Sequence, residues 1–211
     1  MQTQRRLAIL GVIAPLGFLL ISFSMAAVRP ELIRAQGWAG WPSSMARGGW
    51  VGLPQTLAFL GLAVAYPLFA LGAVRPILVD RAAWGGFLGV AVGDLLLAFT
   101  TDPPGADLSL HGGLHVGGVL VVTGSTVVTA IGVTAATRRD PAWRLWRVVG
   151  APMAIVAGAI GLVGGLDAGW AKVVFVVGIT LPVPIIATLL LRGLRGARVA
   201  PPSPHERGGV A

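Results

Sequence analysis

Cysteine is absent from this sequence of 211 residues, and charged side chains make up only 11% of it. Without cysteine, neither disulfide bonds nor thiolate metal sites can form. A soluble domain carries roughly a quarter charged residues, so this chain has too few charges to cover a surface that faces water. Because 55% of the residues are hydrophobic, we expect lipid to be the solvent for most of the chain.

The formal net charge of +8 is the one compositional feature that suggests nucleic acid as a partner. Domains that bind nucleic acid gather Lys and Arg on one face or along one helix. Here the arginines stand in short segments between apolar stretches, where basic residues set the orientation of membrane spans. We therefore expect the lipid bilayer as the main partner, and no nucleic acid.

Six apolar stretches are long enough to cross a bilayer, which takes about 20 residues in a helix. They lie near residues 7–28, 50–74, 82–100, 110–136, 148–166 and 170–191. The first stretch is longer than the apolar core of a signal peptide, which has about 7–15 residues, so we interpret it as an uncleaved span. The sequence predicts an all-α, polytopic membrane helical bundle with six transmembrane helices in a single domain, residues 1–191.

The placement of basic residues predicts that both termini are cytoplasmic, because cytoplasmic connections are enriched in Lys and Arg. With the N-terminus inside, the cytoplasmic segments hold most of these residues: Arg5, Arg6, Arg75, Arg81, Arg138, Arg139, Arg144, Arg147, Arg192, Arg195, Arg198 and Arg207. The outer segments hold only Arg29, Arg34, Arg47 and Lys172. We expect a multi-pass protein of the plasma membrane whose basic, proline-rich tail, residues 192–211, is disordered.

Small residues four positions apart predict close packing between helices, because they let neighbouring backbones approach. Three such pairs lie in the expected spans: Gly89 and Gly93, Gly113 and Gly117, and Gly161 and Gly165. Glycine-rich faces also suit an accessory subunit that packs against another membrane protein. Pro182 and Pro184 predict a kink in the sixth span, because proline interrupts helical hydrogen bonding.

Ionisable side chains within a span are rare and mark functional sites by default. Asp94 lies about six residues from the outer end of the third expected span, and His115 lies about five residues inside the fourth. Gln55 falls near the same level of the second span, and His111 lies one helical turn above His115. Together with Asp102 in the joining loop, these residues predict an outward-facing polar pocket for a lipid headgroup, a small solute or protons.

The alternative for Asp94 and His115 is a structural one, in which they bond each other or nearby hydroxyl groups and hold two helices together. Such interhelical bonds average only about 0.6 kcal/mol, so both interpretations stay open. Loop carboxylates such as Asp107 and Asp167 are expected to be solvated. Lys172, at the outer end of the sixth span, is expected to extend its ammonium group to the headgroups.

Two histidines four residues apart have the spacing of metal ligands on one helical face. His111 and His115, with Asp102 or Asp94, predict an alternative zinc site that would activate water for hydrolysis of lipid amides or esters. Haem is disfavoured, because a membrane haem usually takes histidines from two facing helices and both of these lie on one.

The stretch Phe-Thr-Thr-Asp-Pro-Pro-Gly at 99–105, followed by Leu-His-Gly-Gly-Leu-His at 110–115, resembles the signature of a bacterial and archaeal membrane family called domain of unknown function 998. Asp102, His111, Gly112 and His115 occupy the positions of that pattern. The resemblance implies about six spans and a site at the outer loop, and it implies no particular activity. The pattern is also similar to that of the adiponectin-receptor and ceramidase group of seven-span zinc hydrolases, although this chain has no third histidine in its spans.

Overall fold

The computed structural model describes residues 1–103, 106–163 and 169–199, and all regular structure in these ranges is helical. The α-helices are α1 (Gln2–Val28), α2 (Pro30–Gln36), α3 (Leu53–Phe69), α4 (Arg81–Leu97), α5 (Leu110–Thr137), α6 (Ala151–Leu162), α7 (Gly169–Thr180) and α8 (Pro182–Val199). Short 3-10 turns lie at Gly37–Gly40 (η1), Ser43–Ala46 (η2), Gly49–Val51 (η3) and Pro141–Trp143 (η5). Single π-helical turns extend α3 at Ala70–Val74 (η4) and precede α6 at Trp146–Gly150 (η6).

Five helical segments of the described chain are long and apolar enough to cross a membrane: Gln2–Val28, Leu53–Val74, Leu110–Thr137, Pro141–Leu162 and Gly169–Leu194. They correspond to five of the six expected spans, so the membrane-type helical bundle agrees with the sequence. The remaining expected span, residues 82–100, contains α4, which has only 17 residues. The side chain of Asp80 caps α4 by accepting a 2.7 Å hydrogen bond from the backbone of Ala82.

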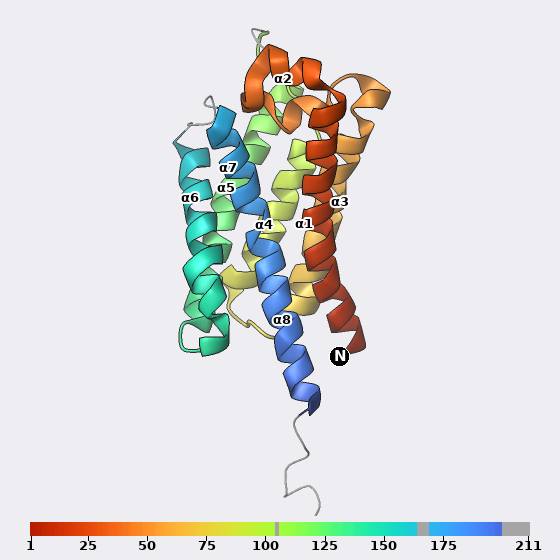
Figure 1. Cartoon of the computed structure of the whole chain (residues 1–211). Helices are drawn as coiled ribbons and strands as arrows, with labels where there is room; N and C mark the ends of the chain where they lie inside the picture. Colours follow the sequence, from red (N-terminus) through yellow and green to blue (C-terminus); the bar gives the residue numbers. More distant parts are fainter. Residues whose placement is uncertain (104–105, 164–168, 200–211) are drawn as a thin grey trace, which may run out of the picture.

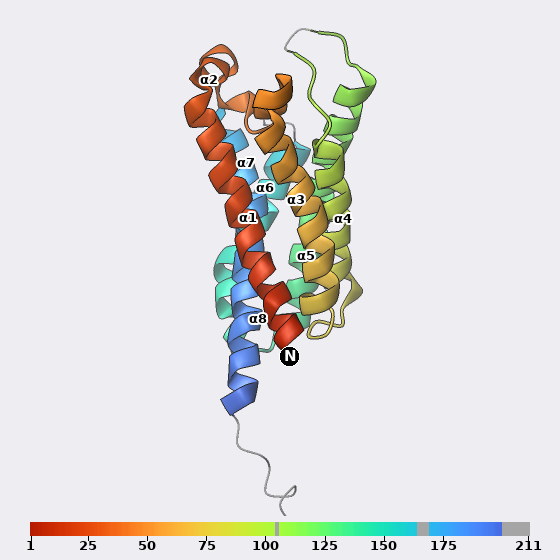
Figure 2. The same cartoon turned by 90° about the vertical axis from the view of Figure 1, so that its right-hand side faces the viewer.

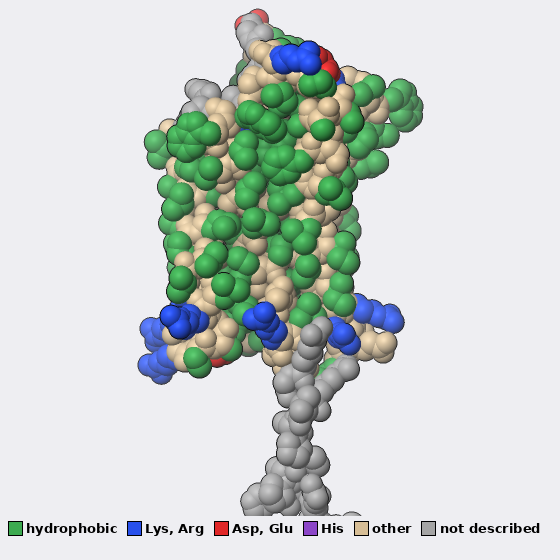
Figure 3. Space-filling model, viewed as in Figure 1, with side chains coloured by type: hydrophobic (Ala, Val, Ile, Leu, Met, Phe, Trp, Pro, Cys, Tyr) green, Lys and Arg blue, Asp and Glu red, His purple; other side chains and the backbone are tan. Residues whose placement is uncertain are grey.

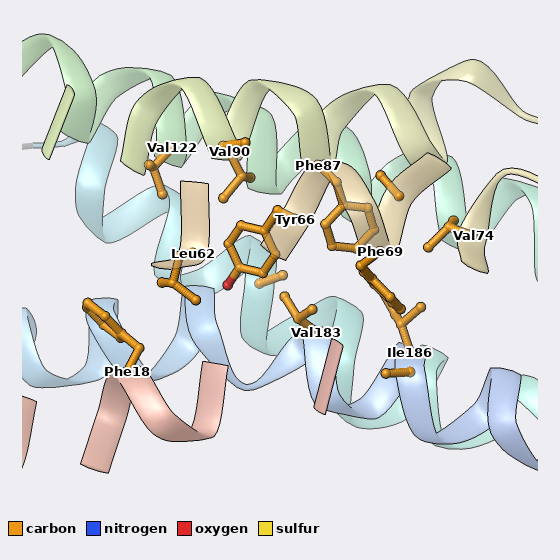
Figure 4. Close-up of a cluster of buried hydrophobic side chains, with 14 of the residues drawn as sticks. Phe18, Leu62, Tyr66, Phe69, Val74, Phe87, Val90, Val122, Val183 and Ile186 are labelled. Atoms are coloured by element: carbon orange, nitrogen blue, oxygen red, sulfur yellow. The ribbon is translucent and has the colours of Figure 1, made fainter. Parts of the chain in front are cut away.

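The long helices lie side by side and close into a ring (Figures 1 and 2). Contacts follow the order α1, α3, α4, α5, α6 and α7, and α8 returns to α1. The short helices α2 and η1–η3 cover one end of this ring, whereas the N-terminus and the end of α8 lie at the other (Figures 1 and 2). Side chains that point inward from the ring, including Phe18, Tyr66, Phe87 and Ile186, form the core (Figure 4).

Glycines allow α4 and α5 to form the most extensive helix pair of the bundle. A Cβ atom on Gly93 would lie 2.8 Å from the backbone nitrogen of Val122, closer than side chains tolerate. Gly89 likewise packs on α5, which confirms the close contact predicted for this pair. The second pair behaves differently, because Gly113 and Gly117 face open space. The third pair includes Gly165, which lies outside the described residues.

The sixth expected span differs from a plain helix in its middle and beyond its end. The chain breaks its helix at Leu181, between α7 and α8, which confirms the interruption predicted from the prolines. α8 continues through Val199, so residues 192–199 are helical and not disordered as predicted. Leu, Ala and Arg are strong helix formers, and they prolong the helix beyond the apolar stretch. Residues 200–211 lie outside the described ranges.

The lateral surface of the bundle is apolar, and Lys and Arg side chains gather at the end opposite α2 (Figure 3). Large hydrophobic side chains are exposed along the helices, among them Ile13, Leu20, Val64 and Leu120. A surface of this kind is unfavourable in water and favourable in hydrocarbon. Together with the five long apolar helices, it indicates a membrane protein.

Candidate functional site

Asp94 lies in the last turn of α4 and points into the bundle, where its side chain is only 4% exposed. Its Oδ2 atom has no hydrogen-bond partner among the described residues. The helix ends at Leu97 rather than at residue 100, so Asp94 is closer to the end of its helix than predicted. A buried carboxylate without a partner is costly, and this cost calls for an explanation in function.

Asp94 lines a narrow cavity inside the ring of helices. Most of the wall is apolar and comes from α1, α3, α4, α5 and α7, and Figure 4 shows Phe18, Leu62, Val90 and Val122 from the first four of these helices. Aromatic side chains are prominent in this wall: Phe18, Phe59, Tyr66 and Phe175. Its other polar contributors are Ser43, Lys172, Thr180 and the phenol of Tyr66. The cavity therefore resembles small-molecule sites, which combine an apolar wall with a few polar groups.

Lys172 lines the same cavity, and the prediction that it extends to the headgroups is wrong. Its side chain is only 8% exposed, and Nζ lies 5.6 Å from the ring centroid of Phe175. Phe175 and Val176 lie three and four residues further along α7, so all three side chains share the face that packs inward. Within the described part of the chain, Lys172 has no hydrogen bond or ion pair, including with Asp94.

His115 does not bond Asp94, contrary to the facing arrangement that the sequence suggested. Its Nδ1 atom lies 2.7 Å from the carbonyl oxygen of Phe99, and its Nε2 atom lies 2.8 Å from the hydroxyl oxygen of Ser43. A carbonyl can only accept, so Nδ1 donates, and Nε2 of a neutral ring then accepts from the hydroxyl. Both nitrogens of this buried imidazole are thereby used in joining α5 to two loops.

A second, wider cavity adjoins the first one. It is lined by His115 together with Arg47 and Thr101 from the loops that cover this end of the bundle. Ser43 and Lys172 line both cavities. Asp94 and His115 therefore occupy neighbouring cavities on either side of these two residues.

The loop before α5 is held by Asp102, which bonds Ser109 twice. Oδ1 accepts a 2.6 Å hydrogen bond from the Ser109 hydroxyl, and Oδ2 accepts a 2.8 Å bond from its backbone nitrogen. These bonds lower the pKa of Asp102, and the nearby charge of Arg47 acts in the same direction. Ser109 in turn accepts a hydrogen bond from the backbone nitrogen of Gly112 and so caps the start of α5.

The loop packs on the first turn of α5 at Gly112, where a Cβ atom would collide with the carboxylate of Asp102. Glycine at this position lets the carboxylate stay where it bonds Ser109, which explains both Asp102 and Gly112 through structure.

Arg47 joins the two loops that cover the cavities, a role that its sequence position did not reveal. Its Nε atom donates to the carbonyl and hydroxyl oxygens of Thr101, at 3.0 and 2.8 Å. A terminal nitrogen of the guanidinium donates to the carbonyl oxygen of Asp102. Partial burial lowers the pKa of Arg47, whereas Asp102 raises it. No short-range pattern predicts such contacts, because the partners are more than 50 residues apart.

The three predicted zinc ligands have different surroundings and different partners. His111 is exposed and packs its ring against Phe99, with 5.7 Å between ring centroids, while His115 is buried and Asp102 bonds Ser109. Among the described residues, no group of three or more His, Asp or Glu side chains is arranged to hold a metal ion. This arrangement does not fit zinc, whose catalytic sites use three protein ligands. The zinc hypothesis stays a prediction.

Gln55, the remaining predicted site residue, lines neither of these two cavities. It is completely buried, and both of its amide atoms lack partners in the described chain. Asp107 is exposed in its loop, as expected. Asp167 lies outside the described residues.

No family model, curated protein or solved structure matches the chain. The resemblance to domain of unknown function 998 therefore stays a prediction. Function has to be inferred from the cavity itself and from the two unpaired charges within it.

Proposed function

We propose that the chain crosses the membrane six times and that both of its ends are in the cytoplasm. In this topology α4 crosses the membrane in addition to the five longer apolar segments. Three observations support this topology. The 17 residues of α4 span about 26 Å at 1.5 Å each, close to a hydrocarbon core of about 30 Å. The N-terminus and the end of α8 lie at the same end of the bundle (Figure 1), which requires an even number of crossings. That end also carries most of the basic side chains (Figure 3).

Within this topology, we propose that the protein binds a small solute or a lipid headgroup in an outward-facing pocket formed by the Asp94 cavity and its neighbour. One observation carries the proposal: Asp94 and Lys172 are both buried in one cavity without a partner of their own. Bundle stability does not account for this arrangement, since unpaired buried charges destabilise a protein. A ligand that bonds both groups does account for it.

Cysteine labelling tests the outward opening, because the natural chain contains no cysteine. Ser43→Cys is nearly isosteric and places a thiol in the wall of both cavities. A small, charged methanethiosulfonate that does not cross membranes is applied to intact cells. We expect it to modify this thiol, and we expect Leu57→Cys, whose exposed side chain faces the acyl chains, to stay unmodified.

Two further single-cysteine variants report the topology in the same experiment. Leu108→Cys lies in the outer loop and should react in intact cells, whereas Arg139→Cys should react only after the cells are permeabilised. If Ser43→Cys stays unmodified, as Leu57→Cys is expected to, the cavity is closed to the outside. Reaction of Arg139→Cys in intact cells would instead reverse the topology.

The two other predicted functions have less support. A zinc-dependent hydrolase requires a third ligand that the described residues do not bring to His111 and His115. An accessory subunit would use the open faces of Gly113, Gly117 and Gly124 on α5, although small residues alone do not identify a partner. Neither alternative accounts for the unpaired carboxylate and ammonium in the same cavity.

A further inference from the structure

The cavity of Asp94 carries one group of each charge, and the two do not neutralise each other. Asp94 contributes from the end of α4 and Lys172 from the first turn of α7, two helices that are not neighbours in the ring. No ion pair joins them in the described part of the chain, although both line the same cavity. A cavity that holds one carboxylate and one ammonium group suits a ligand that carries both a positive and a negative group.

We propose that the ligand of this cavity is a zwitterion, with its ammonium group on Asp94 and its anionic group on Lys172. This inference rests on the proposed binding function and names its chemical class. Charge-assisted hydrogen bonds of this kind are the strong ones, and each would remove the cost of leaving a buried charge unpaired. A ligand with a single charge would satisfy only one of the two protein groups.

The apolar part of the cavity wall limits what can join the two charged ends of the ligand. Phe59, Leu62 and Val176 are among the apolar side chains that line the cavity, and they offer no hydrogen bonds to a polar centre. A short hydrocarbon segment between the charged ends fits such a wall. The hydroxyl groups of Ser43, Thr180 and Tyr66 are the remaining polar contributors. Those of Ser43 and Thr180 already donate to His115 and to the carbonyl oxygen of Val176, so they can only accept from the ammonium end of the ligand.

Two sources can supply this chemistry: a free amino acid, or the phosphoethanolamine headgroup of a phospholipid. Both carry an ammonium group and an anionic group linked by carbon atoms. The outer position of the adjoining cavity, with Arg47 in its wall, admits either of them. The experiment therefore includes one arm for each source.

The first arm measures the Tm of the purified full chain in detergent with glycine, γ-aminobutyrate or ε-aminohexanoate. A ligand that binds only the folded state raises Tm, and we expect one chain length to do so best, because the distance between the protein charges is fixed. Hexanoate and hexylamine each lack one charge and should bind at least about tenfold more weakly, since each loses a charge-assisted bond. Equal shifts with the single-charge compounds would overturn the proposal.

The second arm places the protein in lipid discs that contain phosphatidylethanolamine or, as a control, phosphatidylglycerol. A higher Tm in phosphatidylethanolamine that is lost in the binding variants below identifies a headgroup as the source. A shift with the free amino acids alone identifies a soluble ligand. If neither arm gives a specific Tm shift, the zwitterion proposal is wrong, even where Ser43→Cys labelling has shown an open pocket. The two proposals can therefore fail separately.

Variants link the binding to the two charges. Asp94→Asn and Lys172→Gln should each reduce zwitterion affinity at least about tenfold, and the double variant should abolish the Tm shift. Because the double variant removes both buried charges, it should fold at least as stably as the natural chain without ligand. Asp107→Asn and Arg34→Gln make the same chemical changes at exposed positions and should leave binding unchanged. A double variant that is folded and still binds would contradict the proposal.

Discussion

His115 and Ser43 are 72 residues apart in the sequence, yet Nε2 of the imidazole lies 2.8 Å from the Ser43 hydroxyl oxygen. The other ring nitrogen lies 2.7 Å from the carbonyl oxygen of Phe99. The ring therefore joins α5 to the loop of η2 and to the end of α4, which together cover the cavities. These two hydrogen bonds give the burial of His115 a structural explanation. They do not involve Asp94, whose carboxylate remains available to a ligand.

Replacing His115 by Phe should destabilise the protein by about 1–3 kcal/mol, because the hydroxyl of Ser43 and the carbonyl of Phe99 would then be buried without a partner. The free energy of unfolding in detergent measures this effect. His111→Phe is the matched control: its side chain is exposed, so the change should stay within about 0.5 kcal/mol. Equal effects at both positions would contradict the role assigned to His115.

The hydrogen bonds from Ser109 to Asp102 make the stability of the outer loop dependent on pH. They lower the pKa of Asp102 in the folded protein, so its contribution is complete above the unfolded value of about 3.9. It is lost as the pH falls through the lowered folded value. We expect Asp102→Asn to unfold at a lower temperature than the natural chain at pH 7.

The difference between the two proteins should shrink below about pH 4 as the natural carboxylate becomes protonated. Arg47 and His111 also act on Asp102, and both favour its charged form. Thermal unfolding at both pH values measures the difference. A gap of the same size at both values would show that the carboxylate charge has no part in holding the loop.

Gly118 and Gly117 are adjacent on α5 but have opposite surroundings. A Cβ atom on Gly118 would lie 2.9 Å from the backbone oxygen of Gly93, whereas nothing lies within 4 Å of one on Gly117. Gly118→Ala should therefore force α4 away from α5 and cost about 1–3 kcal/mol. Gly117→Ala should be neutral or stabilising by up to about 1 kcal/mol, and unfolding in detergent compares the two variants. If both variants match the natural chain, the helices are not as close as described.

Gln55 offers a test of an interior polar group outside the cavity. Its amide is completely buried, and neither of its polar atoms has a partner in the described chain. Gln55→Met keeps the size and removes the desolvation cost of the amide, so it should raise the free energy of unfolding by about 1 kcal/mol. A loss of stability instead would reveal that the amide makes a polar contact in the folded protein.

The sequence predicted the coarse fold well because length and apolar composition decide whether a helix can cross a membrane. The interruption at Pro182 and the cap at Ser109 also follow from local chemistry. The prediction for Lys172 was wrong because a residue near the end of an expected span was assumed to face the headgroups. Its direction depends on Phe175 and Val176, which draw that face of α7 into the core.

The candidate site was predicted only in part. Asp94 was found because a charge within an apolar stretch is visible in the sequence, and its burial is confirmed. Ser43 and Arg47 were missed as site residues because their partners lie more than 50 residues away. No local pattern encodes such contacts; they depend on how the loops fold over the end of the ring.

Lys172 is the single lysine of the chain, so lysine labelled with a nitrogen isotope at Nζ gives one resonance in an NMR spectrum. Adding ε-aminohexanoate, glycine or γ-aminobutyrate to the natural protein should shift this resonance, with the largest shift for the compound that raises Tm most. The shift should be much weaker in Asp94→Asn, where the ammonium end of the ligand has lost its partner. An unchanged resonance with all three compounds, or the same shift with hexanoate alone, would contradict joint binding by Asp94 and Lys172.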